Sequence, residues 1–311
     1  MTTALLCPGQ GSQTPGMGEG FYRASGVFRD RFDALADVAD ERGVTDDLRR
    51  LCFDADAETL ARTRYTQPAV YAVSTAAART VAERTDLAVD IVAGHSLGHY
   101  TALVAAGMCA VEDGLELVAK RGTAMERAGT GVSGRMVAVF LADPESVTDV
   151  CAPLRSVAVA GYNTDRQTVV SGPADGVETA LSRIRERADR VRSRDLPVGT
   201  AFHSPLMTPA TGAVTDALQG TRLQPAERPV VSDVTGEPYT DPGVARLDLA
   251  EQVVSPVRWT DVVATLRERG VDRYVELPPA GTLSQFVERL HPEATVVSLE
   301  TPGDLTSLAD Q

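Results

Sequence analysis

The stretch DIVAGHSLGHYTALVAAG, residues 90–107, constrains the fold more than any other part of the chain. Its apolar run from Ile91 to Ala93 predicts a short buried strand, and the residues from Gly98 onward predict a helix. Between them lies Gly-His-Ser-Leu-Gly, so the chain passes from strand to helix in one tight turn. A G-x-S-x-G sequence in this context is typical of a nucleophile elbow, in which a serine projects from strained backbone at the edge of a sheet. The stretch therefore indicates an α/β fold with Ser96 at this turn.

The geometry of such a turn explains its residues. Glycines on both sides of the serine let the backbone pass close to itself. Because the helix begins at once, the backbone N–H of Leu97 points toward whatever Ser96 attacks, which makes it a candidate oxyanion donor. The alternative is a glycine-rich turn with an incidental serine. His95 cannot share the direction of Ser96, so we expect it to pack or to form a hydrogen bond within the turn.

Strands and helices alternate along most of the chain, which favours βαβ units and a parallel sheet. Further strands are expected at Ala4–Cys7, Val137–Phe140, Val157–Ala160, Gln167–Val170, Pro229–Val231 and Arg273–Glu276, and long helices at Val111–Ala128 and Pro173–Ala188. The polar tail after Glu300 is expected to fray.

Residues 131–198 follow a different order: strand, helix, strand, strand, helix, strand. This is the ferredoxin-like order, with its last strand expected near residues 192–198. The sequence therefore predicts an α/β-hydrolase-like core with a parallel sheet, formed by residues 1–130 and 199–311, and a small ferredoxin-like subdomain inserted at 131–198.

Length and charge exclude several classes of protein. A chain of 311 residues suits one large α/β unit or two domains. The net charge of −13 argues against nucleic acid or an anionic membrane as the main partner. The N-terminus lacks the basic region of a signal peptide, and no segment reaches the roughly 18 apolar residues of a spanning helix. We therefore expect a soluble, cytoplasmic protein.

Cysteine spacing gives no sign of a metal site. The four cysteines are far apart in the sequence and are expected to be buried thiols: Cys7, Cys52, Cys109 and Cys151. The sequence also lacks a dinucleotide fingerprint and a phosphate-binding loop. Neither a metal nor another cofactor is expected.

A serine nucleophile needs a base, and the chain has only four histidines. His95 has been considered above. His99 follows Ser96 on the next helix and is a poor candidate for the base, since its side chain should point away from the substrate. His291, in RLHPEA, is expected to lie in an exposed turn. His203, in the apolar loop GTAFHSPLM, is the better base, although a purely structural role stays open at this point.

Seven segments now occur in one order: CPGQGSQTPGMG, YTQPAV, GHSLG, KRGTAM, NTDRQTVVSG, AFHSPLM and SPVRW. Together they strongly resemble the malonyl-CoA:acyl carrier protein transacylases and the related acyltransferase domains of polyketide synthases. The resemblance covers nearly the whole chain. Each motif is weak alone, but seven in order with sensible spacing are specific.

The resemblance implies a ping-pong acyl transfer in polyketide or fatty-acid biosynthesis. Ser96 would be acylated by an acyl-CoA substrate and would pass the acyl group to the phosphopantetheine thiol of an acyl carrier protein. His203 would be the base, oriented by a main-chain carbonyl at or near Gln252. The oxyanion hole would be formed by the backbone N–H groups of Gln10 and Leu97, although PGQGSQ also fits a plain turn after a strand.

The spacing of residues along the helix predicts, independently of the resemblance, where Arg121 lies. The apolar face of its predicted helix carries Leu117, Val118, Ala124 and Met125. Arg121 falls on that face by its spacing, and a buried guanidinium is costly unless it is paired. Glu112 and Asp113 lie too far back along the helix to pair with it. A malonyl carboxylate would suit the planar fork of arginine, and the resemblance implies this role. The commoner alternative is that Arg121 snorkels to the surface.

The resemblance also implies the residues of the acyl pocket, namely Gln67, Asn163, Thr200 and Phe202. Malonyl-specific polyketide acyltransferases usually have His-Ala-Phe-His at the base, and methylmalonyl enzymes have Tyr-Ala-Ser-His. Here the sequence is Thr-Ala-Phe-His, so Phe202 should crowd an α-branch while Thr200 leaves room. Malonyl is the first choice, with a larger α-substituent as the alternative.

Carrier proteins are acidic, and so is this chain, so their association needs a local basic patch. The segment RIRERADRVRSR supplies six arginines: Arg183, Arg185, Arg187, Arg190, Arg192 and Arg194. The alternative is a solvated helix face with pairs such as Glu186–Arg190.

Other functions share some of these residues. One is a serine hydrolase that removes stalled acyl groups from carrier proteins; another is a transacylase for an α-substituted or carrier-bound acyl group. A true α/β-hydrolase could use His291 as its base. An inactive docking protein is the alternative from another class. The chain is expected to act as a monomer.

Overall fold

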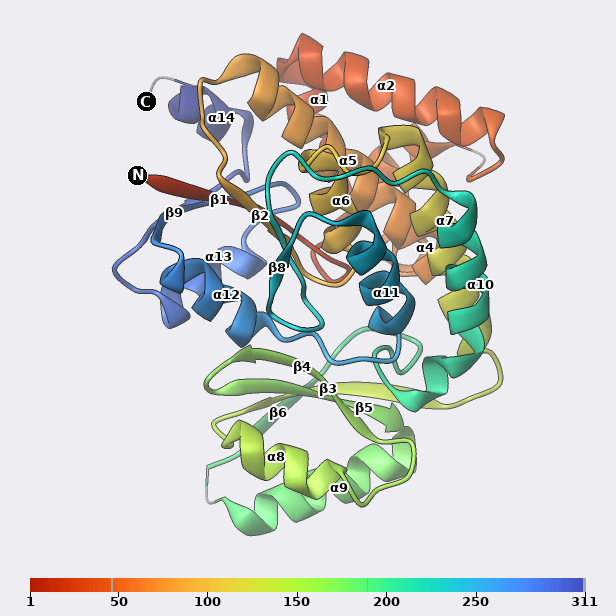
Figure 1. The fold of residues 1–311 in the computed structure, drawn as a ribbon. Coiled ribbons are helices and arrows are strands. Elements are labelled where there is room, and N and C mark those ends of the chain that lie inside the picture. The colour runs from red at the N-terminus through yellow and green to blue at the C-terminus, as the bar shows by residue number, and fades with distance from the viewer. Residues whose placement is uncertain (46, 189, 310–311) are drawn as a thin grey trace.

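The computed structural model describes residues 1–45, 47–188 and 190–309. It contains a large, mostly parallel sheet and a separate, smaller antiparallel sheet (Figure 1). The large sheet has the strand order β10-β9-β1-β2-β7-β8, and only the β7–β8 pair is antiparallel. Its strands are β1 (Thr2–Cys7), β2 (Ile91–Gly94), β7 (Val230–Val231), β8 (Pro238–Tyr239), β9 (Val271–Glu276) and β10 (Thr295–Ser298). The predicted α/β class with a parallel sheet is confirmed.

Successive residues of the central strands point to opposite sides of the large sheet and are apolar on both sides, so helices cover both of its faces. On β1, Leu5 and Cys7 belong to the apolar cluster that includes α5 (Thr63–Arg84). Ala4 and Leu6 belong to the cluster formed with α12 (Trp259–Glu268) and α13 (Thr282–Leu290). The remaining helices of this unit are α1 (Glu19–Ala24), α2 (Gly26–Glu41), α3 (Leu48–Phe53), α4 (Ala57–Leu60), α6 (Gly98–Ala105), α7 (Val111–Ala128), α10 (Thr208–Gly220), α11 (Pro242–Gln252) and α14 (Pro302–Ala309).

The small sheet has the order β4-β5-β3-β6, with every pair antiparallel. Its strands are β3 (Gly134–Phe140), β4 (Ala158–Thr164), β5 (Gln167–Pro173) and β6 (Arg192–Asp195), and its helices are α8 (Pro144–Cys151) and α9 (Ala174–Arg187). Val137 and Val139 pack toward these helices, whereas Met136 packs into the core of the large unit. The small sheet therefore lies between its own helices and the large unit (Figure 1).

Direct hydrogen bonds join the small sheet to the segments that carry the site. The backbone N–H of Tyr162 donates to the Val257 carbonyl at 2.8 Å, and the Val257 N–H donates to the Ala160 carbonyl at 2.9 Å. The Ser171 hydroxyl of β5 donates to the Phe202 carbonyl at 2.7 Å. The loop that carries His203 is thus held by a strand of the small sheet.

Several predictions from the sequence were wrong or incomplete. The two-residue β8 and the edge strand β10 were not predicted. The expected fraying after Glu300 is wrong for Pro302–Ala309, which form α14 and bury Leu308 to 4% exposed, while residues 310 and 311 lie outside the described residues; α14 contacts α1 and α5. His291 is buried, not exposed, and its Nδ1 lies 2.9 Å from the Tyr274 hydroxyl.

Two other expectations concern burial and membranes. All four cysteines are buried free thiols, as expected. Among the residues that the structure describes, no helix combines the length and apolarity needed to cross a bilayer.

Candidate active site

Ser96 lies on the turn between β2 and α6 with φ of +52°, in the left-handed region that non-glycine residues rarely adopt. Close backbone approach explains the neighbouring glycines. A Cβ on Gly98 would lie 2.0 Å from the Cys7 carbonyl oxygen, and one on Gly9 would lie 2.3 Å from the His95 carbonyl oxygen. The turn after β1 and the turn after β2 therefore pack directly on each other.

His203 approaches Ser96 from the loop after the small sheet, just before the 3-10 turn η1 (Pro205–Met207). Its Nε2 lies 2.8 Å from Ser96 Oγ. Its Nδ1 lies 2.9 Å from the carbonyl oxygens of both Gln252 and Ser255. Carbonyls only accept hydrogen bonds, so Nδ1 carries the hydrogen and Nε2 is free to accept the Ser96 hydroxyl proton. His203 also has a positive φ, of +55°.

The surroundings of His203 keep its imidazole neutral. Burial and the positive charge of Arg121 together lower its pKa to about 4, while the Asp233 carboxylate acts in the opposite direction. At neutral pH the ring is therefore in the form that can take up a proton.

Arg121 is 1% exposed on α7, so its predicted place on the buried helix face is confirmed. One guanidinium nitrogen, Nη2, donates to Ser96 Oγ at 3.0 Å and to Gln252 Oε1 at 3.1 Å. The guanidinium carbon lies 5.4 Å from the centre of the Tyr100 ring. Nε has no hydrogen-bond partner, and in the described part of the chain no carboxylate lies within ion-pair distance of Arg121. Asp233 acts on this buried cation only from beyond ion-pair distance, which leaves a place for a substrate carboxylate beside Ser96.

Gln252, at the end of α11, connects the groups of the site. Its Nε2 donates to the Ser96 carbonyl at 3.0 Å and to Asp233 Oδ1 at 2.9 Å, while its own carbonyl accepts from His203. Asp233 Oδ2 in turn accepts the Ser96 N–H at 2.7 Å. Asp233 was not among the predicted site residues. Its position two residues after the apolar strand β7, which pairs with β2, is the sequence signal that could have found it.

The two predicted oxyanion donors both have free N–H groups. Over residues 1–45, 47–188 and 190–309, neither Gln10 N–H nor Leu97 N–H has an acceptor. They follow β1 and β2, which are neighbouring strands, so both turns lie at the same edge of the sheet. Their N–H groups are therefore available to a ligand at Ser96.

The other predicted pocket residues are all buried. Gln67 is fully buried on α5, with its Nε2 3.5 Å from Gln10 Oε1, and its own Oε1 has no partner. Asn163 Oδ1 lies 3.1 Å from His95 Nε2, so the side-chain hydrogen bond of His95 is made to a distant strand and not within its own turn, while its ring packs against Trp259. Thr200 and Phe202 are each 6% exposed in the loop before His203.

One buried group has the spacing of a cation site: His99, Asp233 and Asp248, whose ligand atoms all lie within 4.8 Å of one another. Most of these atoms already have partners. Both oxygens of Asp233 accept hydrogen bonds, and Asp248 Oδ1 accepts from Ser232 at 2.6 Å. The two ring nitrogens of His99 face different carboxylates, each at 3.4 Å. This is the geometry of a charge network, and we assign no metal to it.

The structure does not gather the predicted arginine patch on one surface. All six members are exposed: Arg183, Arg185, Arg187, Arg190, Arg192 and Arg194. On β6, Arg192 lies opposite Phe140 and Arg194 lies opposite Ala138. Residues directly opposite each other in an antiparallel pair share a face, so these two arginines project from the face away from α8 and α9. That face is the one directed toward the large unit.

The α9 arginines lie on the other side of the small sheet. Ser193, opposite the helix-facing Val139, accepts a hydrogen bond from Arg185 at 3.0 Å. Arg183 and Arg187 are exposed on the same helix, whose buried face packs on the sheet. The strand pairing therefore separates one charged stretch of sequence into two surfaces.

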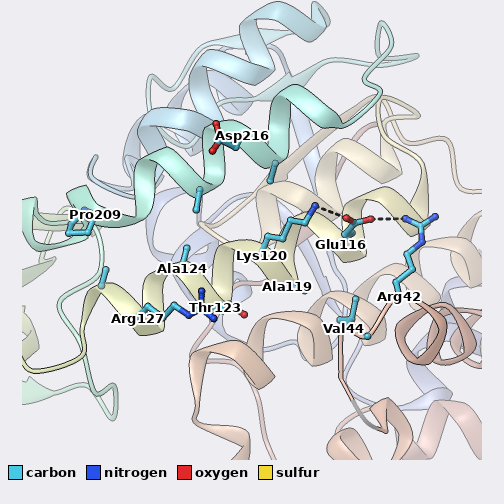
Figure 2. A pocket seen from close by; sticks show the side chains of 14 residues that line it. Arg42, Val44, Glu116, Ala119, Lys120, Thr123, Ala124, Arg127, Pro209 and Asp216 are labelled. Atoms are coloured by element: carbon cyan, nitrogen blue, oxygen red, sulfur yellow. Dashed lines mark hydrogen bonds and ion pairs between the residues drawn. The ribbon is translucent and has the colours of Figure 1, made fainter.

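A separate hollow of about 770 Å³ lies between α7 and α10 (Figure 2). It is lined from the face of α7 that carries Lys120 and Arg127, while Arg121 points to the opposite side of this helix. Glu116 pairs with Lys120 on its own helix and with Arg42, and Arg42 also pairs with Asp113, so two carboxylates offset these two cations. No predicted site residue lies there.

The family model described as the acyl transferase domain matches residues 4–302. The malonyl CoA-acyl carrier protein transacylase of Bacillus subtilis (strain 168) is 35% identical over 303 residues, covering 96% of this chain and 93% of the relative. The polyketide biosynthesis protein ThaF of Burkholderia thailandensis is 37% identical over 324 residues, covering 99% of this chain but 27% of ThaF. The chain thus spans about a quarter of that longer protein.

Solved structures agree along the whole chain. The crystal structure of MCAT from Streptococcus pneumoniae has a TM-score of 0.92 and 33% identity, covering 99% of both chains. The complex PlMCAT:AntF (holo), described as a type II PKS acyl-carrier protein with its malonyl-transacylase, gives a TM-score of 0.94 and 30% identity, covering 100% of this chain and 99% of the other. The resemblance found from the seven sequence segments is confirmed, and the chain belongs to the acyl transferase domain family.

Proposed function

We propose that this protein transfers a malonyl group from coenzyme A to the phosphopantetheine thiol of an acyl carrier protein in polyketide or fatty-acid biosynthesis. The observation that carries the proposal is the convergence of two groups on Ser96 Oγ. His203 Nε2 lies 2.8 Å from it, and the Nη2 of Arg121, a buried cation with no carboxylate partner in the described chain, lies 3.0 Å from it. The name of the B. subtilis relative and that of the PlMCAT:AntF complex support the same reaction.

In the first half-reaction, His203 Nε2 takes the proton from Ser96 Oγ as this oxygen attacks the thioester carbon. The oxyanion of the tetrahedral intermediate accepts hydrogen bonds from the N–H groups of Gln10 and Leu97. The intermediate collapses, the carbon–sulfur bond breaks, and the coenzyme A thiolate receives the proton from Nε2. The carbonyls of Gln252 and Ser255 hold Nδ1–H throughout and stabilise the imidazolium that forms.

The second half-reaction repeats these steps with the carrier protein. The phosphopantetheine thiol gives its proton to His203 Nε2 and attacks the acyl ester. The ester bond breaks, and Ser96 Oγ recovers the proton as the new thioester leaves. The malonyl carboxylate binds the Arg121 guanidinium, while Gln67, Asn163, Thr200 and Phe202 surround the acyl group. The side chain of Phe202 disfavours an α-branch. No cofactor takes part, and acyl-CoA is a substrate.

Intact-protein mass spectrometry tests this proposal. After brief exposure to malonyl-CoA, the wild-type protein should gain the mass of one malonyl group, and the Ser96→Ala variant should gain none. Methylmalonyl-, ethylmalonyl- and acetyl-CoA in separate samples measure the preference for the acyl group. Labelling by acetyl-CoA alone, or by no CoA ester, would contradict the dicarboxylate assignment and favour a hydrolase or a carrier-bound donor.

For the carrier protein, we propose that the arginine run provides the basic surface. Arg192 and Arg194 carry most of this role in the proposal, because their face of the small sheet is directed toward the large unit that holds Ser96. Complementary charge raises the association rate and orients an acidic partner.

Charge reversal on the two faces tests the carrier surface. Arg192→Glu/Arg194→Glu should slow transfer to the carrier protein roughly 10-fold at low salt while leaving Ser96 acylation by malonyl-CoA unchanged. Arg183→Glu/Arg187→Glu makes the same change of charge on α9 and should have a smaller effect. Equal losses in both half-reactions, or equal effects of the two pairs, would argue against this surface.

We also propose a more specific assignment of the fold. We infer an α/β-hydrolase-like core of residues 1–130 and 199–311 and a ferredoxin-like subdomain of residues 131–198. The order β4-β5-β3-β6, with two helices on one face, supports the second assignment. We further infer that the protein is cytoplasmic and monomeric. Size-exclusion chromatography with light scattering would test the oligomeric state.

A further inference from the structure

Asp233 is a buried carboxylate beside the nucleophile that the mechanism above does not use. It is 0% exposed and follows β7, the strand next to β2. Its Oδ2 accepts the Ser96 N–H at 2.7 Å, and its Oδ1 accepts from Gln252 Nε2 at 2.9 Å. The same Gln252 nitrogen reaches the Ser96 carbonyl at 3.0 Å. Asp233 and Gln252 together therefore hold both backbone polar groups of the serine.

The backbone of Ser96 needs this support. Its φ of +52° is a strained conformation for a residue with a side chain, and such a conformation persists only where its surroundings over-determine it. The Ser96 N–H lies between the end of β2 and the start of α6, and its acceptor is a side chain 137 residues away in the sequence. The carboxylate of Asp233 thus fixes the direction in which Ser96 presents its hydroxyl.

A buried carboxylate is costly unless positive charge lies near it. His99, on the first turn of α6, is fully buried, and its Nδ1 lies 3.4 Å from Asp233 Oδ1. Its Nε2 lies 3.4 Å from Asp248 Oδ2 and 2.5 Å from the Tyr239 hydroxyl. The ring therefore faces a carboxylate with each nitrogen, and the Asp233 carboxylate itself is stabilised by the hydrogen bonds from the Ser96 N–H and Gln252 Nε2.

We propose that Asp233 is a positioning residue for acyl transfer. Its carboxylate fixes the turn at Ser96 and also the Gln252 amide. Through Gln252 it aligns the carbonyl that orients His203 and the Oε1 that holds Arg121. This inference rests on the proposed function, because it concerns the presentation of Ser96 to an acyl donor.

The charge of Asp233 has a separate, measurable consequence at His203. The charged and titratable groups that face His203 are Arg121 from α7, Asp233 from the turn after β7, and His95 from the turn after β2. Arg121 and His95 lower the pKa of His203, and Asp233 raises it. Removing the Asp233 charge therefore lowers this pKa further below about 4. Because neutral His203 is the base, the acid limb of the acylation rate should move to lower pH.

Three variants separate position from charge. Asp233→Leu removes the acceptor of the Ser96 N–H. Asp233→Asn keeps one oxygen for the Ser96 N–H and removes the charge. Asp248→Asn is the matched control, since it removes a carboxylate from the other side of His99 but contacts neither Ser96 nor Gln252. The rate of Ser96 acylation by malonyl-CoA is followed by rapid quench and intact mass, from acidic to neutral pH.

We expect Asp233→Leu to acylate about 100-fold more slowly at neutral pH, the effect of misplacing a reacting group by about 1 Å. Asp233→Asn should recover most of the wild-type rate there, with its acid limb displaced to lower pH. Asp248→Asn should keep the wild-type limb. Circular dichroism establishes which variants are folded, and if Asp233→Leu is unfolded, the comparison of the two asparagine variants decides.

Three results would overturn the inference. They are a folded Asp233→Leu that acylates at the wild-type rate, an acid limb of Asp233→Asn that coincides with the wild-type limb, and an equal displacement in Asp248→Asn. Each of them, observed with normal acylation of the wild-type protein, contradicts the role of Asp233 alone. A wild-type protein that forms no adduct contradicts the proposed function and the inference with it.

Discussion

Replacing His203 with alanine is expected to slow the acylation of Ser96 by malonyl-CoA about 10²–10⁴-fold, the usual contribution of a positioned general base. The reason is geometric, since Nε2 lies 2.8 Å from Ser96 Oγ and carries the free lone pair. The rate of adduct formation is measured by rapid quench and intact mass. The same variant should also lose transfer to the carrier protein, because the incoming thiol uses the same nitrogen.

His291→Ala is the matched control for this prediction. His291 is also buried, and its ring also has a hydrogen-bonding partner, the Tyr274 hydroxyl, but it touches no residue of the site. Its loss should lower the free energy of unfolding and leave the acylation rate of the folded protein unchanged. The reverse pattern, with activity lost in His291→Ala and kept in His203→Ala, would identify an α/β-hydrolase that uses His291 as its base.

Replacing Arg121 with alanine is expected to change which acyl group the protein accepts. Truncating one partner of a buried, hydrogen-bonded charge pair costs about 2–5 kcal/mol, and about 1.4 kcal/mol corresponds to a factor of ten. Acylation by malonyl-CoA should therefore fall roughly 30-fold to 4,000-fold. Acylation by acetyl-CoA, which has no carboxylate to bind, should change little. Competition between the two esters, read by intact mass, gives the ratio directly.

The wild-type protein and the Arg121→Ala variant must be compared at a pH at which His203 is neutral in both. Arg121 lowers the pKa of His203, so its removal raises that pKa. Measurement above the usual histidine pKa of about 6.5 keeps the ring neutral in the variant as well. Arg121→Lys is the conservative control and should be intermediate, because a lysine keeps the charge and loses the planar fork. An equal loss with both esters would show that Arg121 serves the structure of the site and not the choice of substrate.

Local physics explains how much of the site can be found in the sequence. The turn at Ser96 is visible because strand, glycines and helix follow one another within a few residues. The buried face of α7 is visible because helical periodicity places Arg121 beside Leu117 and Met125. The carbonyl of Gln252 was different, since the resemblance to acyltransferases located it and no spacing in the sequence could have done so.

The tertiary structure decided the contacts that join distant segments. The orienting carbonyls of His203 come from residues 49 and 52 positions away, and the acceptor of the Ser96 N–H comes from 137 positions away. The buried histidine at the end of α13 and the helix after Glu300 were also mispredicted, because both depend on surfaces that distant elements supply. Burial of a polar residue follows from its packing partners, which its own neighbours in the sequence do not reveal.

The arginine run shows the same division most simply. Its composition alone determined that a cluster of positive charge exists in this acidic chain. Which of those charges face the same way was decided by the register of β6 on β3, which turns Arg192 and Arg194 toward the large unit, away from α9. The sequence by itself determined the elements and the chemical groups they carry, because propensity and periodicity act over a few residues. Their meeting at Ser96 was decided by strand order and register, which depend on the burial and hydrogen bonding of the whole chain.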